Sequence, residues 1–449
     1  MKYTFIIAAG LLMALGSCTK YLEAVPNSGL TVPRTAADFE QILENEVMIL
    51  NTPVLGEFSA DDFYMPDAVL ASQNVQLRNS FIWAKDIYEG GAASGWANMY
   101  NKIYNANIVL EGLERQSAQG AVVARANEIK SWALFCRAQA LHDLAQVFAQ
   151  PYKPQSAEQD LGLPLKLSTN LTEFATRATV AQTYNQIVTD LLSSIPELPD
   201  NITKSHRNRP CKAAGYALLA RVYLNMQNYK LALDAAGKSL NLYAVLLDYN
   251  LANTASALPF SPLTDEVMLV STQVTYSNRT WQVDRQLYNS FDNNDLRKTL
   301  FFTFNAAANT ILYKGYYGDI YGGFSGMATP EQYLIKAECL ARLNQPEAAL
   351  NALNILLLNR YKKQTYVNYT TEHTAEVLKL ILTERRKENI FRNLRWSDLR
   401  RLNQDDQFAV TINRTVNGLN YQLLPNSVRY TFPIPDDEIR AGGMQQNPR

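Results

Sequence analysis

A helical face that contains two carboxylates constrains this fold more than any other sequence feature. It lies in and just before the segment 381–402, ILTERRKENIFRNLRWSDLRRL. Its members, spaced three or four residues apart, are Val377, Ile381, Glu384, Glu388 and Phe391. Such spacing puts the side chains on one side of a helix. The face begins and ends with apolar residues, so we expect it to pack on the core and its carboxylates to need paired cations.

Nearby arginines are the expected partners of these carboxylates: Arg385, Arg392, Arg395, Arg400 and Arg401. Paired carboxylates also serve glycoside hydrolases. A general acid needs a raised pKa, however, and adjacent arginines hold carboxyls ionised. We therefore predict no catalytic residue here, but a structural ion-pair motif that comprises Glu384, Glu388, Arg395 and Asp398.

The rest of the chain has mainly helical periodicity. Apolar stripes predict helices over about 96–113, 122–149 and 179–195. Residues 213–242 have the spacing of a tetratricopeptide helix pair, and a second copy follows around 333–353. We predict a mainly α fold, a tetratricopeptide-like scaffold of helix pairs with a long irregular insertion at about 243–329. Residues 57–88 are expected to form loop and short strand.

The first residues have the pattern of a targeting segment. Lys2 precedes an unbroken apolar run from Phe5 to Leu15, which is too short to span a bilayer and is typical of a signal peptide. Leu15-Gly16-Ser17-Cys18 resembles a bacterial lipobox. We predict a lipoprotein signal peptide over 1–17, lipidation of Cys18, and one large domain over 18–449, because no linker-like stretch divides it.

Composition excludes some function classes. The chain has 42 basic and 42 acidic residues, and a nucleic-acid binder usually has a basic excess. His142, His206 and His373 are isolated, so no metal site and no cofactor are predicted. Cys136 and Cys339 fall within apolar helical stripes and are expected to be buried free thiols.

Tyrosine and glycine are concentrated in the insertion. Glycines let the backbone bend sharply and can bring aromatic rings to a surface. Trp96 and Tyr100 are also candidate platforms for a ligand, but their helical spacing favours core packing.

Several segments, in the same order as in the family, resemble the SusD/RagB family of lipid-anchored nutrient-binding proteins of Bacteroidetes outer membranes. Residues 96–113 resemble its W-x-x-x-Y-x-x-I-x-x-AN helix. The block from Glu384 to Arg401 resembles its ERR-E-F and RW-DLRR signature. YTFPIPDDEI (430–439) and QNP (446–448) resemble its closing motifs.

The resemblance implies a cell-surface lipoprotein of the outer membrane that binds a nutrient, usually a glycan, and delivers it to a SusC-like TonB-dependent transporter without catalysis. The expected ligand platforms are Trp83, Tyr276, Trp281, Tyr316, Tyr317 and Tyr321, with Asp62 and Arg78 as polar contacts. The alternatives are a peptide ligand, as in RagB-like members, a surface glycoside hydrolase that uses Glu384 and Glu388, and a scaffold that binds only protein.

Overall fold

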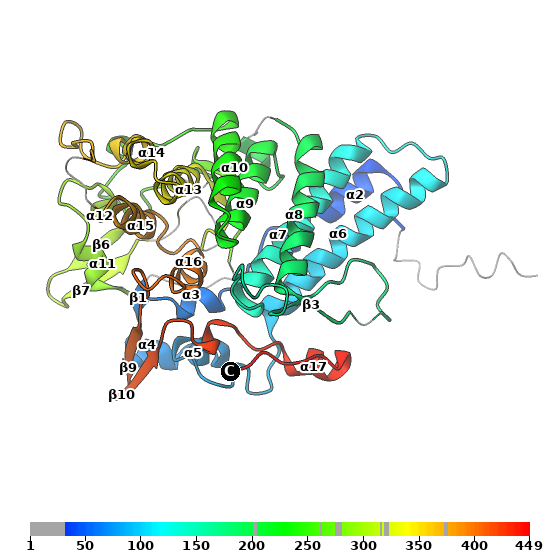
Figure 1. Cartoon of the computed structure of the whole chain (residues 1–449), viewed down its shortest axis with the longest axis horizontal. Coiled ribbons are helices and arrows are strands. Elements are labelled where there is room, and N and C mark those ends of the chain that lie inside the picture. Colours follow the sequence, from blue (N-terminus) through cyan, green and yellow to red (C-terminus); the bar gives the residue numbers. More distant parts are fainter. Residues whose placement is uncertain are drawn as a thin grey trace, which may run out of the picture.

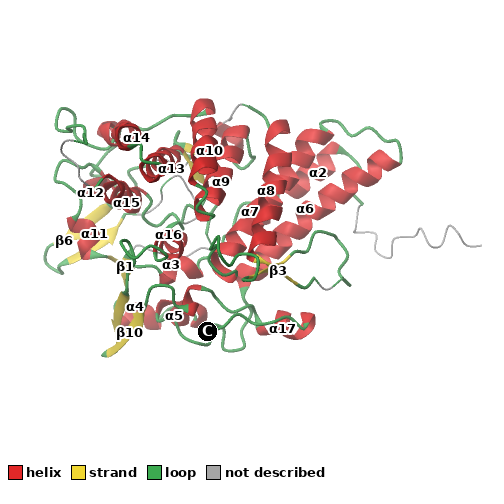
Figure 2. Cartoon of the chain, viewed as in Figure 1, coloured by secondary structure: helices red, strands yellow, loops and turns green. Residues whose placement is uncertain are grey.

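The computed structural model describes residues 32–173, 175–200, 204–260, 263–273, 281–314, 317, 323–371 and 376–449. Helices are the dominant regular structure in it and the strands are short (Figure 2), so the mainly α prediction is confirmed. The predicted signal peptide and Cys18 lie outside the described residues.

The longer helices are α6 (Ser94–Ala118), α7 (Ala126–Phe148), α8 (Val180–Ser194), α9 (Lys212–Asn225), α10 (Tyr229–Leu242), α13 (Thr329–Arg342), α14 (Pro346–Leu358) and α15 (Val377–Glu388). The shorter helices are α2 (Ala36–Leu43), α3 (Leu55–Ser59), α4 (Asp67–Ala71), α5 (Val75–Phe81), α11 (Arg285–Asn289), α12 (Arg297–Leu300), α16 (Arg395–Leu402) and α17 (Asp436–Gly442).

The long helices pack side by side in a row that follows the chain (Figure 1). Helix α7 packs between α6 and α8, α9 pairs with α10, and α13 packs on α10, α14 and α15. Alanines that are fully buried lie along the paired helices, among them Ala217 and Ala220 on α9 and Ala232 on α10. Such small side chains let helices approach closely. The two predicted tetratricopeptide-like pairs are thus α9–α10 and α13–α14.

Two segments are more ordered than the sequence suggested. Residues 57–88, predicted as loop and short strand, include the helices α4 and α5 and the end of α3, and they contribute the fully buried Phe58 and Phe81 to the core. The insertion carries strands as well as loops. An isolated apolar run too short for clear periodicity does not distinguish a buried helix from a loop.

A four-stranded antiparallel sheet links these two segments in the order β1-β5-β7-β6. Its strands are β1 (Phe63–Tyr64), β5 (Gln282–Val283), β7 (Thr310–Tyr313) and β6 (Phe302–Asn305). Two-stranded pairs elsewhere are β2 (Leu161–Pro164) with β3 (Arg177–Thr179), β4 (Val267–Leu269) with β8 (Met327–Ala328), and β9 (Ile412–Val416) with β10 (Leu419–Leu423).

The carboxylates of α15 lie in a buried network of charges. Glu384 and Glu388 are at most 1% exposed. Arg297 Nη1 lies 3.1 Å from Glu388 Oε2, and Arg297 also pairs with Glu384. Arg360 Nη2 lies 3.0 Å from Glu388 Oε1. The network therefore joins α12, the end of α14 and α15 through opposite charges.

Four carboxylates and four cations balance in this network. Its acidic members are Glu266, Asp295, Glu384 and Glu388, and its basic members are Arg297, Arg360, Lys387 and Arg392. Burial alone raises the pKa of Glu384 and Glu388, but the adjacent cations outweigh it, so the pKa of each carboxyl lies below its ordinary value. A lowered pKa does not suit a general acid.

The arginines closest in sequence mostly have other partners, which corrects the predicted pairing. Of the five expected donors only Arg392 reaches Glu388, at 3.5 Å. Arg385 pairs with Asp398 at 2.8 Å and Arg395 with Asp61 at 2.6 Å. The remaining two, Arg400 and Arg401, bind backbone carbonyls of residues 145, 146 and 149 and the carboxylate of Glu338, respectively.

Removing one member of the network is predicted to be costly. In Glu388→Ala, Arg297 and Arg360 stay buried with fewer counter-charges, so we expect the free energy of unfolding to fall by about 3–5 kcal/mol. The control is Glu376→Ala, which removes an exposed partner of Lys379 and should change the stability little. Urea unfolding followed by circular dichroism measures both, and equal losses would contradict the role of the network.

Glu57 is a buried carboxyl outside this network, and it forms no ion pair with a cation of the described residues. Glu57 is 1% exposed, and its Oε2 accepts hydrogen bonds from the Asn393 amide at 2.8 Å and from Gln273 at 3.4 Å. Burial, followed by the charge of Asp62, raises the pKa of Glu57 to about 8. Between pH 4.5 and about 8, the folded protein therefore retains a proton that the unfolded chain has lost.

This proton difference predicts that stability falls as the pH rises through that window. Glu57→Gln stays neutral at every pH and should lose this contribution, so its stability should change less than that of the wild type between pH 5 and pH 8. Urea unfolding at a series of pH values compares the two proteins. Parallel pH profiles would show that Glu57 is ionised in the folded state.

Candidate functional site

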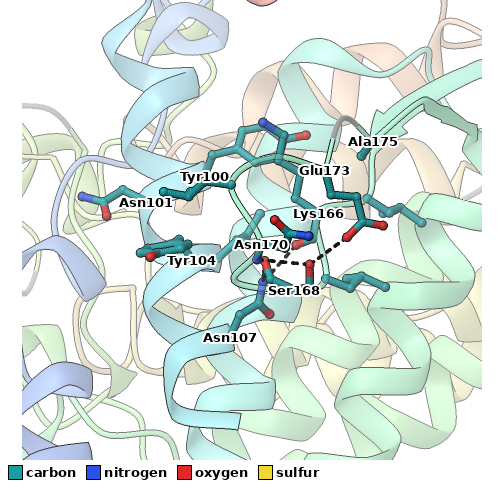
Figure 3. Close-up of a pocket in the computed structure, with 13 residues that line it drawn as sticks. Tyr100, Asn101, Tyr104, Asn107, Lys166, Ser168, Asn170, Glu173 and Ala175 are labelled. Carbon is teal, nitrogen blue, oxygen red and sulfur yellow. Dashed lines mark hydrogen bonds between the residues drawn. The ribbon is translucent and has the colours of Figure 1, made fainter. Parts of the chain in front are cut away.

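A hollow of about 530 Å³ lies between α6 and the segment 165–173 with Ala175 (Figure 3). Its lining combines aromatic, amide, charged and aliphatic side chains: Tyr100, Asn101, Ile103, Tyr104, Asn107, Leu165, Lys166, Leu167, Ser168, Asn170, Leu171, Glu173 and Ala175. We call it the α6 hollow.

Helix α6 presents two tyrosines to the α6 hollow. Tyr100 and Tyr104 are four residues apart and so lie on the same side of the helix. The hydroxyl of Tyr100 donates to the carbonyl of Pro164 at 2.8 Å, and burial raises its pKa well above the ordinary value, so it stays a neutral donor. Tyr104 is half-buried and its hydroxyl bonds to no other described residue. Tyr104 therefore has a ring face and a hydroxyl available for a ligand.

Trp96, one turn before Tyr100, belongs to the core. It is 2% exposed, and its ring meets the ring of Phe148 edge-on at 5.1 Å. Its ring centroid also lies 4.7 Å from that of Tyr100. The core interpretation thus holds for Trp96, whereas Tyr100 both packs on Trp96 and lines the hollow.

The opposite wall of the hollow is fixed by hydrogen bonds from three helices. Asn107, 1% exposed, donates to the carbonyls of Lys166 and Ser168 at 3.1 and 3.3 Å. Its own oxygen accepts from Arg137 at 3.0 Å, and Arg137 makes two 2.8 Å bonds to Asp190. Asp190 of α8, Arg137 of α7 and Asn107 of α6 thus form a chain that ends on the loop backbone.

The rim of the α6 hollow is polar and carries both charges. Lys166 Nζ lies 5.8 Å from the Tyr100 ring centroid and 4.0 Å from Glu438. The hydroxyl of Ser168 donates to Glu173 at 3.1 Å, and the backbone N–H of Asn170 donates to that hydroxyl at 3.4 Å (Figure 3). Rings with an amide and charged rim suit a ligand that has apolar faces and many hydroxyls.

The structure corrects three of the predicted aromatic platforms. Trp83 and Trp281 are fully buried and Tyr317 is 2% exposed. Trp83 donates to the carbonyl of Ser59 at 3.0 Å, and Trp281 stacks on Phe63 with ring centroids 4.1 Å apart. Tyr317 donates to Glu266 at 2.5 Å. A ring that is enclosed on both faces cannot receive a sugar.

The polar candidates have structural partners too. Asp62 is 1% exposed and accepts from Arg386 at 2.8 Å, so it is a core ion-pair member and not a rim contact. Arg78 is half-buried, donates to the carbonyl of Gln73 at 2.5 Å, and does not line the α6 hollow. The predictions for Tyr276, Tyr316 and Tyr321 lie outside the described residues.

Sequence reasoning missed Tyr104, Asn101 and the polar segment after Leu165. The available signal was a second tyrosine one turn after Tyr100, on the same helix face. Among the described residues, no group of histidine, cysteine, aspartate and glutamate side chains could hold a metal ion. Cys136, Cys211 and Cys339 are buried free thiols.

Comparisons with known proteins agree on one family. Residues 20–224 match the family described as "Starch-binding associating with outer membrane", and residues 327–449 match the SusD family. No curated protein matches the chain. In the part of the chain that the structure describes, no helix is both long and apolar enough to cross a membrane.

Solved structures share the fold. A SusD superfamily protein from Bacteroides thetaiotaomicron is 23% identical, with a TM-score of 0.71 over 92% of this chain and 100% of its own. One from Bacteroides fragilis is 20% identical, with a TM-score of 0.73 over 92% and 99%. Surface glycan-binding protein A from Bacteroides fluxus is 16% identical, with a TM-score of 0.69 over 93% and 100%.

The hydrogen bonds of Asn107 are predicted to keep the loop of residues 165–171 ordered. Asn107→Ala removes both bonds to the carbonyls of residues 166 and 168, so we expect faster hydrogen exchange across residues 165–171 and a stability loss of about 1–3 kcal/mol. Asn105→Ala, on the same helix but with no hydrogen bond from its side chain to a described residue, is the control. Unchanged exchange in Asn107→Ala would show that other contacts order the loop.

Proposed function

Because this chain belongs to the SusD/RagB family, we propose that it is a nutrient-binding protein that holds a glycan in the α6 hollow. The observation that supports this most directly is the composition of the hollow, two tyrosine side chains on one helix face with an amide and charged rim. No catalytic step is part of the proposal.

Sugar rings fit such a surface for a simple physical reason. A pyranose has a face of C–H groups that loses water when it lies on an aromatic ring, and a rim of hydroxyls that needs hydrogen bonds. Tyr104 offers the ring, and Asn101 offers an amide that can both donate and accept. The side-chain oxygen of Asn170 accepts from Thr172, so Asn170 offers its NH2 group as a donor. Contacts of this kind give modest affinity, which suits a protein that must release its cargo.

Delivery of the glycan to a SusC-like TonB-dependent transporter is the second part of the proposal. It rests on the family match and on the description of that family as associating with the outer membrane. A lipid on Cys18, after removal of residues 1–17, would hold the domain 18–449 at the outer membrane, and we place it on the cell surface. The supporting feature is the apolar run that precedes the lipobox-like Leu15-Gly16-Ser17-Cys18.

A peptide ligand is the alternative that the hollow itself supports. Leu165, Leu167 and Leu171 line the same wall, and Leu171 is 78% exposed. Aliphatic side chains of an extended peptide could contact these leucines. Titration of the protein with oligosaccharides and with peptides distinguishes the two ligand classes.

The test is isothermal titration calorimetry of the mature protein against neutral oligosaccharides, including maltooligosaccharides, and against peptides. Tyr104→Ala is predicted to weaken glycan binding about 5- to 30-fold, which corresponds to about 1–2 kcal/mol for a lost ring contact. The control is Tyr64→Ala, which removes a tyrosine that is 39% exposed on β1, outside the α6 hollow. Glycan binding that Tyr104→Ala does not weaken would exclude this site, and binding of peptides alone would favour the alternative.

A further inference from the structure

A second hollow of about 690 Å³ lies next to the α6 hollow, between α6 and α7. Its lining residues are Leu110, Glu111, Leu113, Glu114, Ser117, Ala118, Ala126, Asn127, Lys130, Leu134, Arg137 and Leu167. We call it the helix-pair hollow. Its apolar lining consists of leucine and alanine side chains and includes no tyrosine.

The two hollows are neighbours along one side of α6. Positions 100, 104, 107, 111, 114 and 118 follow at spacings of three and four, so one stripe of the helix lines both hollows. Leu167, which is 38% exposed, lines both of them and lies at their junction. From Asn101 to Ala118 the helix rises about 25 Å, which is much longer than one sugar ring.

Hydrogen bonds fix the loop at the boundary between the two hollows. Glu111 accepts a hydrogen bond from the amide of Thr169 at 2.7 Å, and Asn107 binds the carbonyls of Lys166 and Ser168. These bonds hold the loop across α6 and leave the side chain of Leu167 at the surface. The junction of the two hollows therefore presents the aliphatic side chain of Leu167 to a ligand.

The charges along this path are balanced. In the helix-pair hollow Glu111 and Arg137 already bind partners within the protein, and Glu114 and Lys130 remain exposed with no ion pair to a described residue. In the α6 hollow Lys166 lies 4.0 Å from Glu438, and Glu173 accepts a hydrogen bond from Ser168. The lining of each hollow carries as many carboxylates as cations, which gives no net attraction for an acidic or a basic ligand.

We propose that the ligand is a neutral, linear oligosaccharide that lies in the α6 hollow and continues over Leu167 into the helix-pair hollow. This inference rests on the proposed function and adds the length and charge class of the glycan. Leu113 and Leu134 supply an aliphatic floor for C–H faces, and Glu114, Asn127 and Lys130 supply hydrogen bonds for hydroxyls. An aliphatic floor holds a sugar less strongly than a ring, so the second hollow strengthens binding but does not bind alone.

The length claim is tested with maltooligosaccharides and cellooligosaccharides from the disaccharide to the octasaccharide, titrated against the mature protein. For the series that binds, affinity is expected to rise at least tenfold between the shortest and the longest bound members. Ser117→Trp places a large side chain in the helix-pair hollow at an exposed position near the end of α6. It should reduce the affinity of the longest members to that of the shortest and leave the shortest unchanged.

The control is Gln119→Trp, which adds the same side chain at the exposed residue after α6, outside the hollow lining. It should leave both short and long members unchanged. The charge claim is tested with oligogalacturonides of matched length, which should bind at least tenfold more weakly than the neutral series.

The outcomes separate the two proposals. Equal affinity for short and long neutral members, no effect of Ser117→Trp on long members, or equal binding of the oligogalacturonides would overturn this inference and leave the proposed function standing. If neither the neutral nor the acidic oligosaccharides bind, the proposed glycan-binding function fails and this inference fails with it.

Discussion

The fold depends on the pairing of charges that have been removed from water. Glu388 lies between Arg297 of α12 and Arg360, which follows α14, and each of these three side chains is fully buried. An unpaired charge in this place would cost several kcal/mol, so α12, α14 and α15 cannot separate without that cost. The insertion is thereby tied to the tetratricopeptide-like scaffold through its arginine and not only through its apolar side chains.

The sequence could predict one half of this arrangement. Helical spacing puts Glu384 and Glu388 on a buried face, and burial demands cations, so the kind of interaction followed directly. The identity of the cations did not, because Arg297 and Arg360 approach only through the tertiary fold, from 91 and 28 residues away in the chain. Meanwhile Arg385 and Arg395, which are near in sequence, serve Asp398 and Asp61.

The lining of the α6 hollow could not be predicted for the same reason, because it depends on contacts between residues far apart in the chain. Helix α6 could be predicted from periodicity, but the same spacing favoured core packing for Tyr100, and aromatic content does not say which rings face water. Trp281 became core because β5 pairs with β1 and brings its ring onto Phe63, a contact between residues more than two hundred positions apart. The α6 hollow exists only because a polar loop crosses the helix, and a sequence gives no indication of where such a loop will rest.

Rigid support of that loop is what makes the hollow suitable for capture. A loop held by Asn107, which Arg137 and Asp190 hold in turn, is ordered before the ligand arrives, so binding need not order it. In the proposed function the ligand contacts are few and exposed at the rim, an arrangement that would keep affinity modest and release easy. The stability network around Glu388 belongs to α15, far along the helical row from α6 (Figure 1). If the α6 hollow binds the ligand as proposed, stability and binding rest on different helices, and side chains that line the hollow can change without disturbing the buried charges that hold the fold.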